Sequence, residues 1–445
     1  MNADSAPAPV SPADRGLGPA FGRLWAAAIA SNLADGIGRT AIPLIATTLT
    51  KDPLLISAVT AVAFLPWLLF GLPAGLLIDR VDRRRAMAVA NGLRVAMALA
   101  VAVAITTGVL TIWLLYACIL IWGMGETVFD TATNAVLPST VRVSQLEPAN
   151  GRIQAAQLVV DTFVGTPLSG VLFALAIAVP IWSTAGGFAV SALLVLFLPV
   201  SVARAAAAAD ATAADATAAD ATAPPRRGIR RLAHEARESL SFLWQHRLLR
   251  GLLVFTTLAG GLLAFGQASE ILYLLDTMAV PPGLLGFALA GIGVGALLGA
   301  LTASRLVVRF GRGKVMWTAT ALGGVGLGLV GLVPTLPVAI TSWAISAYAI
   351  SVWNVPWSAL RQQLIPHVML GRTIGFIRSL TWGIIPVGTI LGGFVARLDL
   401  RLPFLIGGVG IVIVVLLGTR LLLSIDRRTA DYSSSSNASG NPSAG

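Results

Sequence analysis

The sequence predicts an all-α membrane protein in which twelve transmembrane helices form two pseudo-symmetric six-helix bundles, and three observations predict this fold class. The 445 residues are 56% hydrophobic and only 11% charged, whereas a soluble domain carries about 25% charged residues. Apolar stretches of about 20 residues, long enough to cross the hydrocarbon core of a bilayer, recur along nearly the whole chain. A long polar segment separates the first six of these stretches from the last six.

The expected helices are joined mostly by short loops that carry turn residues, such as KDP, VPP and PTLP. We expect the first six helices, to within a few residues at each end, over 21–49, 54–78, 86–108, 111–137, 150–177 and 179–203. The last six are expected over 250–279, 283–308, 315–334, 337–363, 371–396 and 402–424.

These helices divide the chain into five parts. A disordered tail is expected over 1–20, which lacks the basic start and short apolar core of a signal peptide, and another over 425–445. The N-terminal bundle covers 21–203 and the C-terminal bundle covers 250–424. Residues 204–249 are predicted to form a cytoplasmic linker between the two bundles.

The predicted linker contains the unit ADATA three times in succession. Alanine favours helix, but the threonines and the following PPRRG do not, so we expect a flexible tether. The next stretch, RRLAHEARESLSFLWQHRLLR, mixes leucine and aromatic residues with arginine, histidine and glutamate. That pattern is typical of a helix lying at the membrane interface, with Trp244 at the depth of the lipid headgroups.

The positions of lysine and arginine orient the chain in the membrane. If both termini are cytoplasmic, the outer loops carry only Lys51, Arg397 and Arg401. The inner loops and tails then carry Arg80, Arg83, Arg84, Arg85, Arg142, Arg226, Arg227, Arg230, Arg231, Arg309, Arg312, Lys314, Arg372, Arg427 and Arg428. Cytoplasmic loops are enriched in these residues, and the arginine-rich, lysine-poor composition fits a GC-rich bacterium. We therefore expect a multi-pass protein of a bacterial inner membrane with both termini cytoplasmic.

The sequence offers little for catalysis or for nucleic-acid binding. Cys118 is the single cysteine, which excludes an intrachain disulfide, and the three histidines lie far apart in predicted loops. No G-x-x-x-x-G-K-[ST] motif is present, so transport energy should come from an ion gradient. The net charge of +11 belongs mainly to the anionic inner leaflet. We therefore expect no metal, no cofactor, no nucleic-acid partner and no enzyme activity.

The loop after the second expected helix carries a recognisable motif. The stretch GLLIDRVDRRRAMA is similar to the pattern G-x-x-x-D-R-x-G-R-R, although Asp82 stands where the pattern has glycine. The second half has a degenerate echo, SRLVVRFGRGK, in which Val308 occupies the acidic position. Together with twelve helices in two sets of six, these residues resemble the major facilitator superfamily, which implies its fold and transport by gating. The matching positions of this gating motif are Gly75, Asp79, Arg80, Arg83 and Arg84.

Three further stretches resemble one branch of that superfamily, the group of enterobactin exporters and macrolide efflux pumps. They are GETVFDTATNAVLPSTV, RESLSFLWQHRLLR and RQQLIPHVMLGRTIGFIRSLTWGIIPVGTILGG. The resemblance extends over residues 21–424 and implies efflux, antiport and a role in multidrug resistance. GTPLSG, in the fifth expected helix, also resembles a worn form of the G-P-x-x-G-G signature of antiporters.

The fifth and eleventh expected helices mirror each other. Gly151, in ANGRIQAAQLVVDTFVGTPLSG, aligns with Gly371, and Pro167 aligns with Pro386 after one gap. Parallel repeats related by an axis along the membrane normal would produce this correspondence.

Polar residues on otherwise apolar helices must face protein or water, because lipid cannot satisfy them. Glu126, Asp130 and Asn134 recur every four residues and so share one face of the fourth expected helix. Like charges one turn apart and partial desolvation favour the neutral form of Glu126 and Asp130, which could then load and release a proton. Arg39, four residues after Asp35, would keep Asp35 ionised. We therefore rank Asp130 and Glu126 ahead of Asp35 as proton carriers. The residues expected to line the substrate cavity are Arg39, Asn134, Asp161, Glu270, Tyr273, Trp353 and Asn354.

Purely structural roles are the alternative for several of these residues. Either acid of the fourth expected helix could pair with Arg94 of the third as a clamp. Asp35 could pair with Arg39, four residues later, and orient its own helix. Trp353 could pack in a core instead of forming an aromatic wall for an apolar ligand.

The gating motif has a physical role available to it. Asp79 ends the second expected helix, where it could accept hydrogen bonds from the positive N-terminus of a helix in the other half, such as the eleventh. Arg80, Arg83 and Arg84 can bridge to acids or to inner-leaflet phosphates. Such contacts would hold a cytoplasmic gate closed in the outward-facing state. The alternative is a purely topogenic role for these charges.

These observations predict a secondary active transporter that exports an amphipathic or hydrophobic small molecule, such as a drug, siderophore or secondary metabolite, in exchange for protons. We expect alternating access, a monomer, and the substrate, protons and anionic inner-leaflet lipids as partners. The alternatives are an uptake symporter for a polar metabolite and, from another class, a membrane enzyme or a non-transporting sensor. An enzyme would need a nucleophile and base or metal ligands within the helices, and a sensor would usually add a folded soluble domain.

Overall fold

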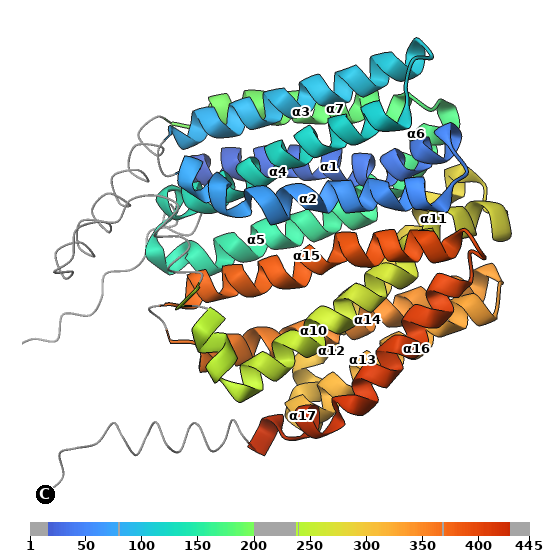
Figure 1. The fold of residues 1–445 in the computed structure, drawn as a ribbon. Coiled ribbons are helices and arrows are strands. Elements are labelled where there is room, and N and C mark those ends of the chain that lie inside the picture. The colour runs from blue at the N-terminus through green and yellow to red at the C-terminus, as the bar shows by residue number, and fades with distance from the viewer. Residues whose placement is uncertain (1–16, 79–80, 200–236, 239, 367–368, 428–445) are drawn as a thin grey trace, which may run out of the picture.

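The computed structural model describes residues 17–78, 81–199, 237–238, 240–366 and 369–427, and these form helices and connecting turns without any strand (Figure 1). The N-terminal half consists of α1 (Gly18–Leu49), α2 (Pro53–Ile78), α3 (Arg83–Thr106), α4 (Ile112–Thr140), η2 (Val143–Gln145), α5 (Leu146–Leu158), η3 (Val159–Gly165), α6 (Thr166–Leu175) and α7 (Val179–Leu196). The C-terminal half consists of α10 (Arg247–Gly266), η4 (Gln267–Ser269), α11 (Glu270–Leu272), η5 (Tyr273–Thr277), α12 (Pro282–Phe310), α13 (Arg312–Leu332), α14 (Leu336–Leu364), α15 (Leu370–Ala396), α16 (Leu402–Leu417) and α17 (Thr419–Leu423).

The lengths and compositions of these helices suit a membrane. Ten helical stretches of the described residues are long and apolar enough to cross one, and the bent pair Leu402–Leu417 and Thr419–Arg427 makes an eleventh. The remaining pass is α1, whose 32 residues exceed the length needed for a span but carry Asp35 and Arg39 in the middle. The structure thus confirms an all-α membrane fold with six passes in each half.

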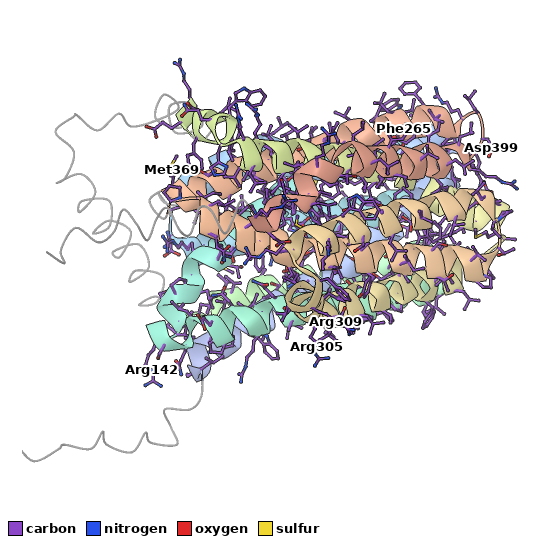
Figure 2. All side chains as sticks on the ribbon, turned by 90° about the horizontal axis from the view of Figure 1, so that it is seen from below. Arg142, Phe265, Arg305, Arg309, Met369 and Asp399 are labelled. Carbon is purple, nitrogen blue, oxygen red and sulfur yellow. The ribbon has the colours of Figure 1, made fainter. Side chains whose placement is uncertain are left out.

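The passes run side by side, so that their connecting turns gather at two ends (Figures 1 and 2). One end holds Arg142 and Met369 together with both ends of the described chain, and we call it the termini end. The opposite end, which includes Asp399, is called the far end.

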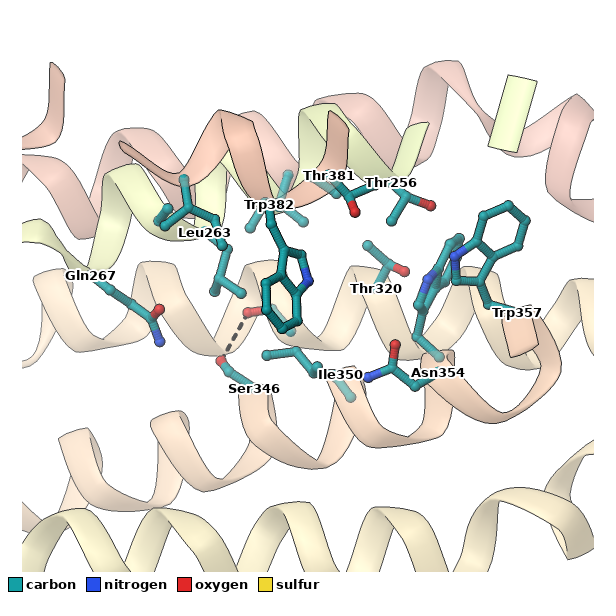
Figure 3. Close-up of a pocket in the computed structure, with 18 of the residues that line it drawn as sticks. Thr256, Leu263, Gln267, Thr320, Ser346, Ile350, Asn354, Trp357, Thr381 and Trp382 are labelled. Atoms are coloured by element: carbon teal, nitrogen blue, oxygen red, sulfur yellow. Dashed lines mark hydrogen bonds between the residues drawn. The ribbon is translucent and has the colours of Figure 1, made fainter. Parts of the chain in front are cut away.

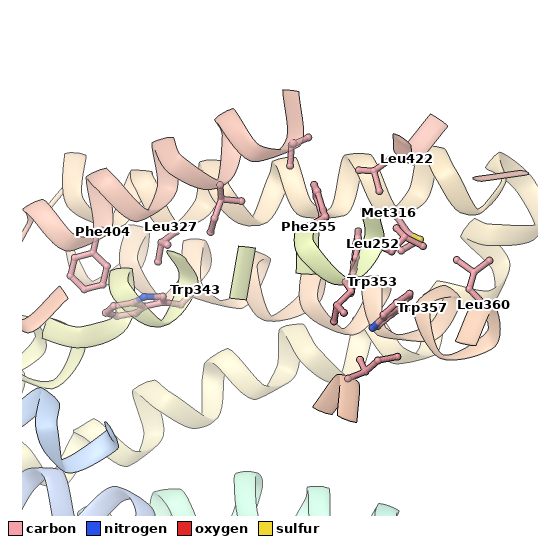
Figure 4. Close-up of a cluster of buried hydrophobic side chains, with 14 of the residues drawn as sticks. Leu252, Phe255, Met316, Leu327, Trp343, Trp353, Trp357, Leu360, Phe404 and Leu422 are labelled. Atoms are coloured by element: carbon pink, nitrogen blue, oxygen red, sulfur yellow. The ribbon is translucent and has the colours of Figure 1, made fainter. Parts of the chain in front are cut away.

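Each half buries an apolar core of its own. In the N-terminal half, Trp122 of α4 packs edge-on against Phe188 of α7, with ring centroids 5.0 Å apart. In the C-terminal half, Phe404 lies between Tyr273, at 4.9 Å, and Trp343, at 5.8 Å (Figure 4). These aromatic contacts fix the helices within each half.

The two halves meet along two helix pairs, α2 with α15 and α6 with α12. In both pairs the second pass of one half packs against the fifth pass of the other, as expected for two pseudo-symmetric bundles. Glycine permits the close approach, because a side chain at Gly286 would collide with the backbone of Thr166 and one at Gly393 would collide with Ser57.

The fifth pass is not the single helix expected over 150–177, since the π-helical turn η3 separates α5 from α6. A π-helical turn accommodates one extra residue in a helix. The fifth pass has one more residue between its Gly-Arg pair and its proline than the eleventh, which is continuous as α15. The gap in the internal repeat therefore coincides with this turn. Gly36 lets α1 approach it closely, because a side chain there would collide with the backbone of Asp161.

Most of the expected linker, with its ADATA repeat, lies outside the described residues. Residues 240–245 are helical and lead to His246, after which α10 begins. Leu243 is 1% exposed and belongs to the C-terminal core, whereas Trp244 is 59% exposed. This segment therefore has one buried side and one exposed side, as an interfacial helix requires.

Candidate functional site

A cavity of about 740 Å³ lies in the C-terminal half, against α2 of the other half (Figure 3). Thr60 and Phe64 of α2 complete a wall built mainly by α10, α13, α14 and α15. Gln267 and Trp357 lie at opposite ends of the cavity, and the Trp382 ring projects between them. Hydroxyl and amide groups interrupt the apolar wall at Thr256, Gln267, Thr320, Ser346, Asn354, Thr381 and Thr389. A mostly apolar wall with a few polar groups suits a small organic ligand.

One charged group of this wall, Arg378, packs against two aromatic rings. Its guanidinium lies 4.0 Å from the ring centroid of Trp382 on its own helix and 5.0 Å from that of Trp67 on α2. The two tryptophans meet edge to face at 5.7 Å. Arg378 is two turns along α15 from the termini end, about 12 Å in depth. No acid among the described residues forms an ion pair with it, although its charge interacts at longer range with that of Asp130.

Two further charged groups, Arg361 and Glu270, complete the wall. The guanidinium of Arg361 lies 5.1 Å from the ring centroid of Trp357 on the same helix, one turn from the termini end. Its Nε atom is buried and has no hydrogen-bond partner. Glu270, at the start of α11, lies towards the far end of the cavity. The wall thus carries two guanidinium groups at one end and one carboxylate towards the other.

Three of the residues expected to line a substrate cavity line this one: Glu270, Trp353 and Asn354. That the cavity binds the substrate stays a prediction. The prediction for Tyr273 is wrong. Its side chain is fully buried in the C-terminal core, and its hydroxyl donates a 2.8 Å hydrogen bond to the carbonyl of Val330. The seventh pass changes from α10 through η4 and α11 to η5, and these breaks remove Tyr273 from the face that carries Glu270. Arg39, Asn134 and Asp161 belong to the N-terminal half and do not line this cavity.

The N-terminal half contains a buried network centred on Arg94 of α3, a side chain with no exposed surface. Its guanidinium forms an ion pair with Asp35 of α1. It also donates to the hydroxyl of Ser31 at 2.9 Å and to the amide oxygen of Asn91 at 3.2 Å. The ring of Phe188 lies 3.8 Å beneath it. The clamp with Arg94 is therefore made by Asp35 rather than by an acid of α4.

A second charged cluster joins three elements through Arg39 of α1. Its Nη1 atom donates to Oδ2 of Asp161 in η3 at 2.8 Å, and its Nη2 atom lies 3.7 Å from Oε1 of Glu126 on α4. The four-residue spacing had suggested a pair between Arg39 and Asp35, but Arg39 pairs with Asp161 and Glu126 instead. The hydroxyl of Thr166 donates to the backbone carbonyl of Asp161 at 3.1 Å and fixes the same turn. One guanidinium thus links α1, α4 and the π-helical turn.

Asp130 lies one turn beyond Glu126 on α4, half-buried. No hydrogen bond or ion pair to its carboxylate is present among the described residues, so its charge is not committed to a structural contact. Asn134, one turn further on, is exposed. Of the three polar residues on this face of α4, only Glu126 takes part in the Arg39 cluster.

Two ion pairs connect the halves at the far end. Lys51, in the turn after α1, lies 3.1 Å from Oδ1 of Asp276 in η5. Arg397, at the end of α15, binds Asp52 through two nitrogens, with Nε to Oδ1 at 2.8 Å. The hydrogen bonds from Arg397 hold the pKa of Asp52 below its usual range. Both pairs tie the first turn of the N-terminal half to the other half.

The gating motif is described only in part. Asp79 and Arg80 lie outside the described residues, and only the backbone of Gly75 is described. Arg83 donates to the carbonyl of Ala135 at 2.8 Å, and Arg84 donates to the carbonyl of Leu198 at 3.0 Å. Both arginines therefore bind the C-terminal parts of neighbouring helices in their own half, where a positive charge is favoured.

Sequence reasoning missed several functional candidates. Arg361 and Arg378 were not singled out, although an arginine inside an apolar stretch is itself a signal of a protein-facing or water-facing site. Asp426 was also missed: it accepts hydrogen bonds from the backbone N–H groups of Arg312, at 3.0 Å, and Gly313, at 3.1 Å, at the start of α13. A carboxylate there stabilises the positive end of the helix.

The sequence matches the model of one protein family over residues 9–443, and that family is described as transmembrane secretion effector. The chain is 27% identical over 401 residues to the multidrug efflux pump Tap of Mycolicibacterium fortuitum, covering 86% of this chain and 92% of that protein. It is 23% identical over 402 residues to macrolide efflux protein A of Streptococcus pyogenes, covering 89% and 94%.

Solved structures with the same fold include the nucleoside transporter NupG, with a TM-score of 0.68 and 15% identity over 91% of this chain and 99% of that one. A bacterial homologue of the iron transporter ferroportin matches with a TM-score of 0.67 and 15% identity, covering 91% and 98%. At such low identity these likenesses concern the fold alone.

Proposed function

Because the chain belongs to the transmembrane secretion effector family of the major facilitator superfamily, we propose that it exports an amphipathic or hydrophobic small molecule in exchange for protons. Membership makes the chain a multi-pass membrane transporter. The proposal adds the direction of transport, the coupling ion and the kind of cargo. The efflux pumps to which the chain is similar support the direction.

The cavity against α2 carries the proposal. It holds about 740 Å³, which is within the range of drug-sized ligand sites. Its aromatic and aliphatic wall would bury the body of an amphipathic molecule, and its hydroxyl and amide groups would orient the polar end. A polar metabolite would leave most of that wall without a matching surface.

Alternating access requires a gate on each side of the cavity. The ion pairs Lys51–Asp276 and Asp52–Arg397 fasten the halves at the far end. The described arginines of the gating motif, Arg83 and Arg84, bind within their own half at the termini end. These contacts support a conformation in which the cavity is reached from the termini end. Since the loops at that end carry most of the lysine and arginine, we assign it to the cytoplasm.

Proton coupling is assigned to the charged cluster of the N-terminal half. A proton on Glu126 or Asp161 would remove a negative charge that faces Arg39 and would weaken its link between α1, α4 and η3. The charge of Asp130 also interacts with that of Arg39, and its carboxylate has no hydrogen bond or ion pair among the described residues. Asp35 is the least suited of the four acids, because Arg94 already neutralises it in a buried pair.

The test uses inverted membrane vesicles from a bacterial host that lacks its main efflux pumps. Their lumen is acidified with ATP, and acridine orange reports proton release when tetracycline, erythromycin, chloramphenicol or naphthalene-1-acetate is added outside. We expect at least one compound to release protons from vesicles that contain the protein, and Asp130→Asn or Glu126→Gln to reduce that release. A protein that releases protons with none of the panel, or equally well in both variants, contradicts the proposed coupling. Net inward transport in whole cells would instead indicate an uptake symporter.

A further inference from the structure

We propose that the transported molecule is an amphipathic organic anion, whose acidic group binds Arg378 and Arg361 while its apolar body lies against the aromatic wall of the cavity. This inference rests on the proposed export function and names the substrate class for the same cavity. Three properties of the wall carry it: the surroundings of Arg378, the buried and unsatisfied nitrogen of Arg361, and the separation of the two arginines from Glu270.

Arg378 has two aromatic rings against one side, and its guanidinium edge forms no ion pair among the described residues. The rings of Trp382 and Trp67 lie 4.0 and 5.0 Å from its guanidinium, and stacking on aromatic faces leaves the N–H groups in the guanidinium plane free to donate. Asp130 interacts with it only at longer range and does not form an ion pair. A planar carboxylate, which accepts two parallel hydrogen bonds from an arginine, fits this unoccupied edge.

Arg361 supplies a second donor from α14. Its Nε–H is buried without a hydrogen-bond partner in the described structure, and leaving a buried donor unsatisfied is destabilising. Trp357 covers its guanidinium at 5.1 Å, much as Trp382 covers that of Arg378. Both arginines line the cavity, so an anion inside it would pair with guanidinium charges that form no ion pair among the described residues.

The distribution of charge along the cavity wall also favours an organic anion over an organic cation. The wall has two guanidinium groups towards the termini end and one carboxylate, Glu270, towards the far end. A molecule that enters from the termini end meets positive charge first, and an organic cation would be repelled there before reaching Glu270. Between these groups lie Trp353, Ile350 and Leu263, which match an aromatic or aliphatic body rather than a second polar group.

Three probes that share one aromatic body test this proposal: naphthalene-1-acetate, its neutral amide, and the cation 2-(1-naphthyl)ethylammonium. Binding to the purified full-length protein in detergent micelles is measured at neutral pH by calorimetry, without any ion gradient. We expect the anion to bind at least about tenfold more tightly than the amide, a difference of about 1.4 kcal/mol, and the cation to bind most weakly.

Four variants locate the contact. We expect Arg378→Gln and Arg361→Gln each to weaken binding of the anion about tenfold while leaving the affinity for the amide unchanged, which also shows that the variants are folded. Glu270→Gln should not weaken binding of the anion. Arg305→Gln, which removes an exposed arginine of α12 outside the cavity, is the matched control and should change neither affinity.

Three outcomes overturn the proposal: a cation that binds as tightly as the anion, no measurable binding of any probe, or equal losses for anion and amide in Arg378→Gln. These outcomes are distinct from a failure of the export function. An exporter of cations would release protons in the vesicle assay and still fail this binding test.

Discussion

The two halves of the molecule use their charged residues in opposite ways. In the N-terminal half, Arg94 and Arg39 form ion pairs with acids on neighbouring elements. In the C-terminal half, Arg361 and Arg378 are covered by tryptophan rings and line a cavity without an ion-pair partner among the described residues. A paired charge holds helices together and changes state when protonated, whereas an unpaired charge on a cavity wall awaits a ligand. This difference underlies our proposal that the N-terminal half carries coupling and the C-terminal half carries recognition.

The largest expected effect is on stability, from Arg94→Met. The substitution leaves Asp35 buried without its partner, and removing one member of a buried ion pair costs about 3–5 kcal/mol. Unfolding in detergent, followed by tryptophan fluorescence, should show a loss of this size. The double variant Arg94→Met with Asp35→Asn should recover part of it, and Arg305→Met should show none. An unfolding curve of Arg94→Met that overlies the wild type would remove the distinction between the halves.

The next effect is on coupling, from Arg39→Gln. Without this guanidinium, Glu126 and Asp161 lose their common partner, so we expect substrate-driven proton release to fall about tenfold. Naphthalene-1-acetate should still bind with unchanged affinity, because Arg39 does not line the cavity. Arg39→Lys, which keeps the charge, is the control. A parallel loss of binding and coupling would mean that the two halves do not divide these tasks.

A smaller effect is expected from Tyr273→Phe. The variant loses the hydrogen bond to the carbonyl of Val330 and should lower the free energy of unfolding by about 0.5–1.5 kcal/mol. Binding of the anion should not change, since Tyr273 lies in the core. A change in affinity for the anion without a change in the free energy of unfolding would indicate that Tyr273 lines the cavity after all.

The smallest effect is expected at the far end, where Arg397→Gln removes an ion pair that is partly exposed. Ser57 lies between the halves and is 2% exposed, so Ser57→Cys in a Cys118→Ala background reports opening by reaction with an impermeant maleimide. We expect labelling to rise by less than about threefold, because exposed ion pairs contribute little. Unchanged labelling with both far-end pairs removed would argue against this gate.

The pH dependence of the same gate has a definite sign. Arg397 lowers the pKa of Asp52, so the pair stabilises the closed far end above the ordinary pKa of aspartate, about 3.9. That stabilisation is lost only as pH falls through the lowered value. Only the thiolate reacts with maleimide, so labelling of Ser57→Cys is divided by that of a free thiol at the same pH. This ratio should be constant between about pH 6 and 8. A pH dependence of transport in this range would then have its origin outside this gate.

Hydropathy alone predicts the passes, their order and their division into two sixes, because burial in lipid requires about 20 apolar residues for each pass. It does not predict where a helix breaks, as at Val159–Gly165, since a π-helical turn leaves the composition unchanged. Hydropathy and spacing also did not predict which charged residues pair with each other. Asp35 and Arg39 are one turn apart in sequence, yet Asp35 pairs with Arg94, whose stem lies against Gly125 where a side chain would not fit.

The sequence prediction named three residues of the cavity wall and missed its two arginines. Glu270, Trp353 and Asn354 were expected to line it and do. Arg378 was not predicted because the sequence prediction relied on groups that exchange protons. Its contacts with two tryptophans from different halves also form only in the folded state.

The π-helical turn also bears on the history of the chain. If a six-helix ancestor was duplicated, a length change of one codon within one copy is enough to distinguish the fifth pass from the eleventh. Counted from the Gly-Arg pair of each, Asp161 and Thr381 occupy the same position. One now binds Arg39 and the other lines the cavity. Two copies of one helix can therefore acquire different contacts without gaining a new helix, through one substitution and one extra residue.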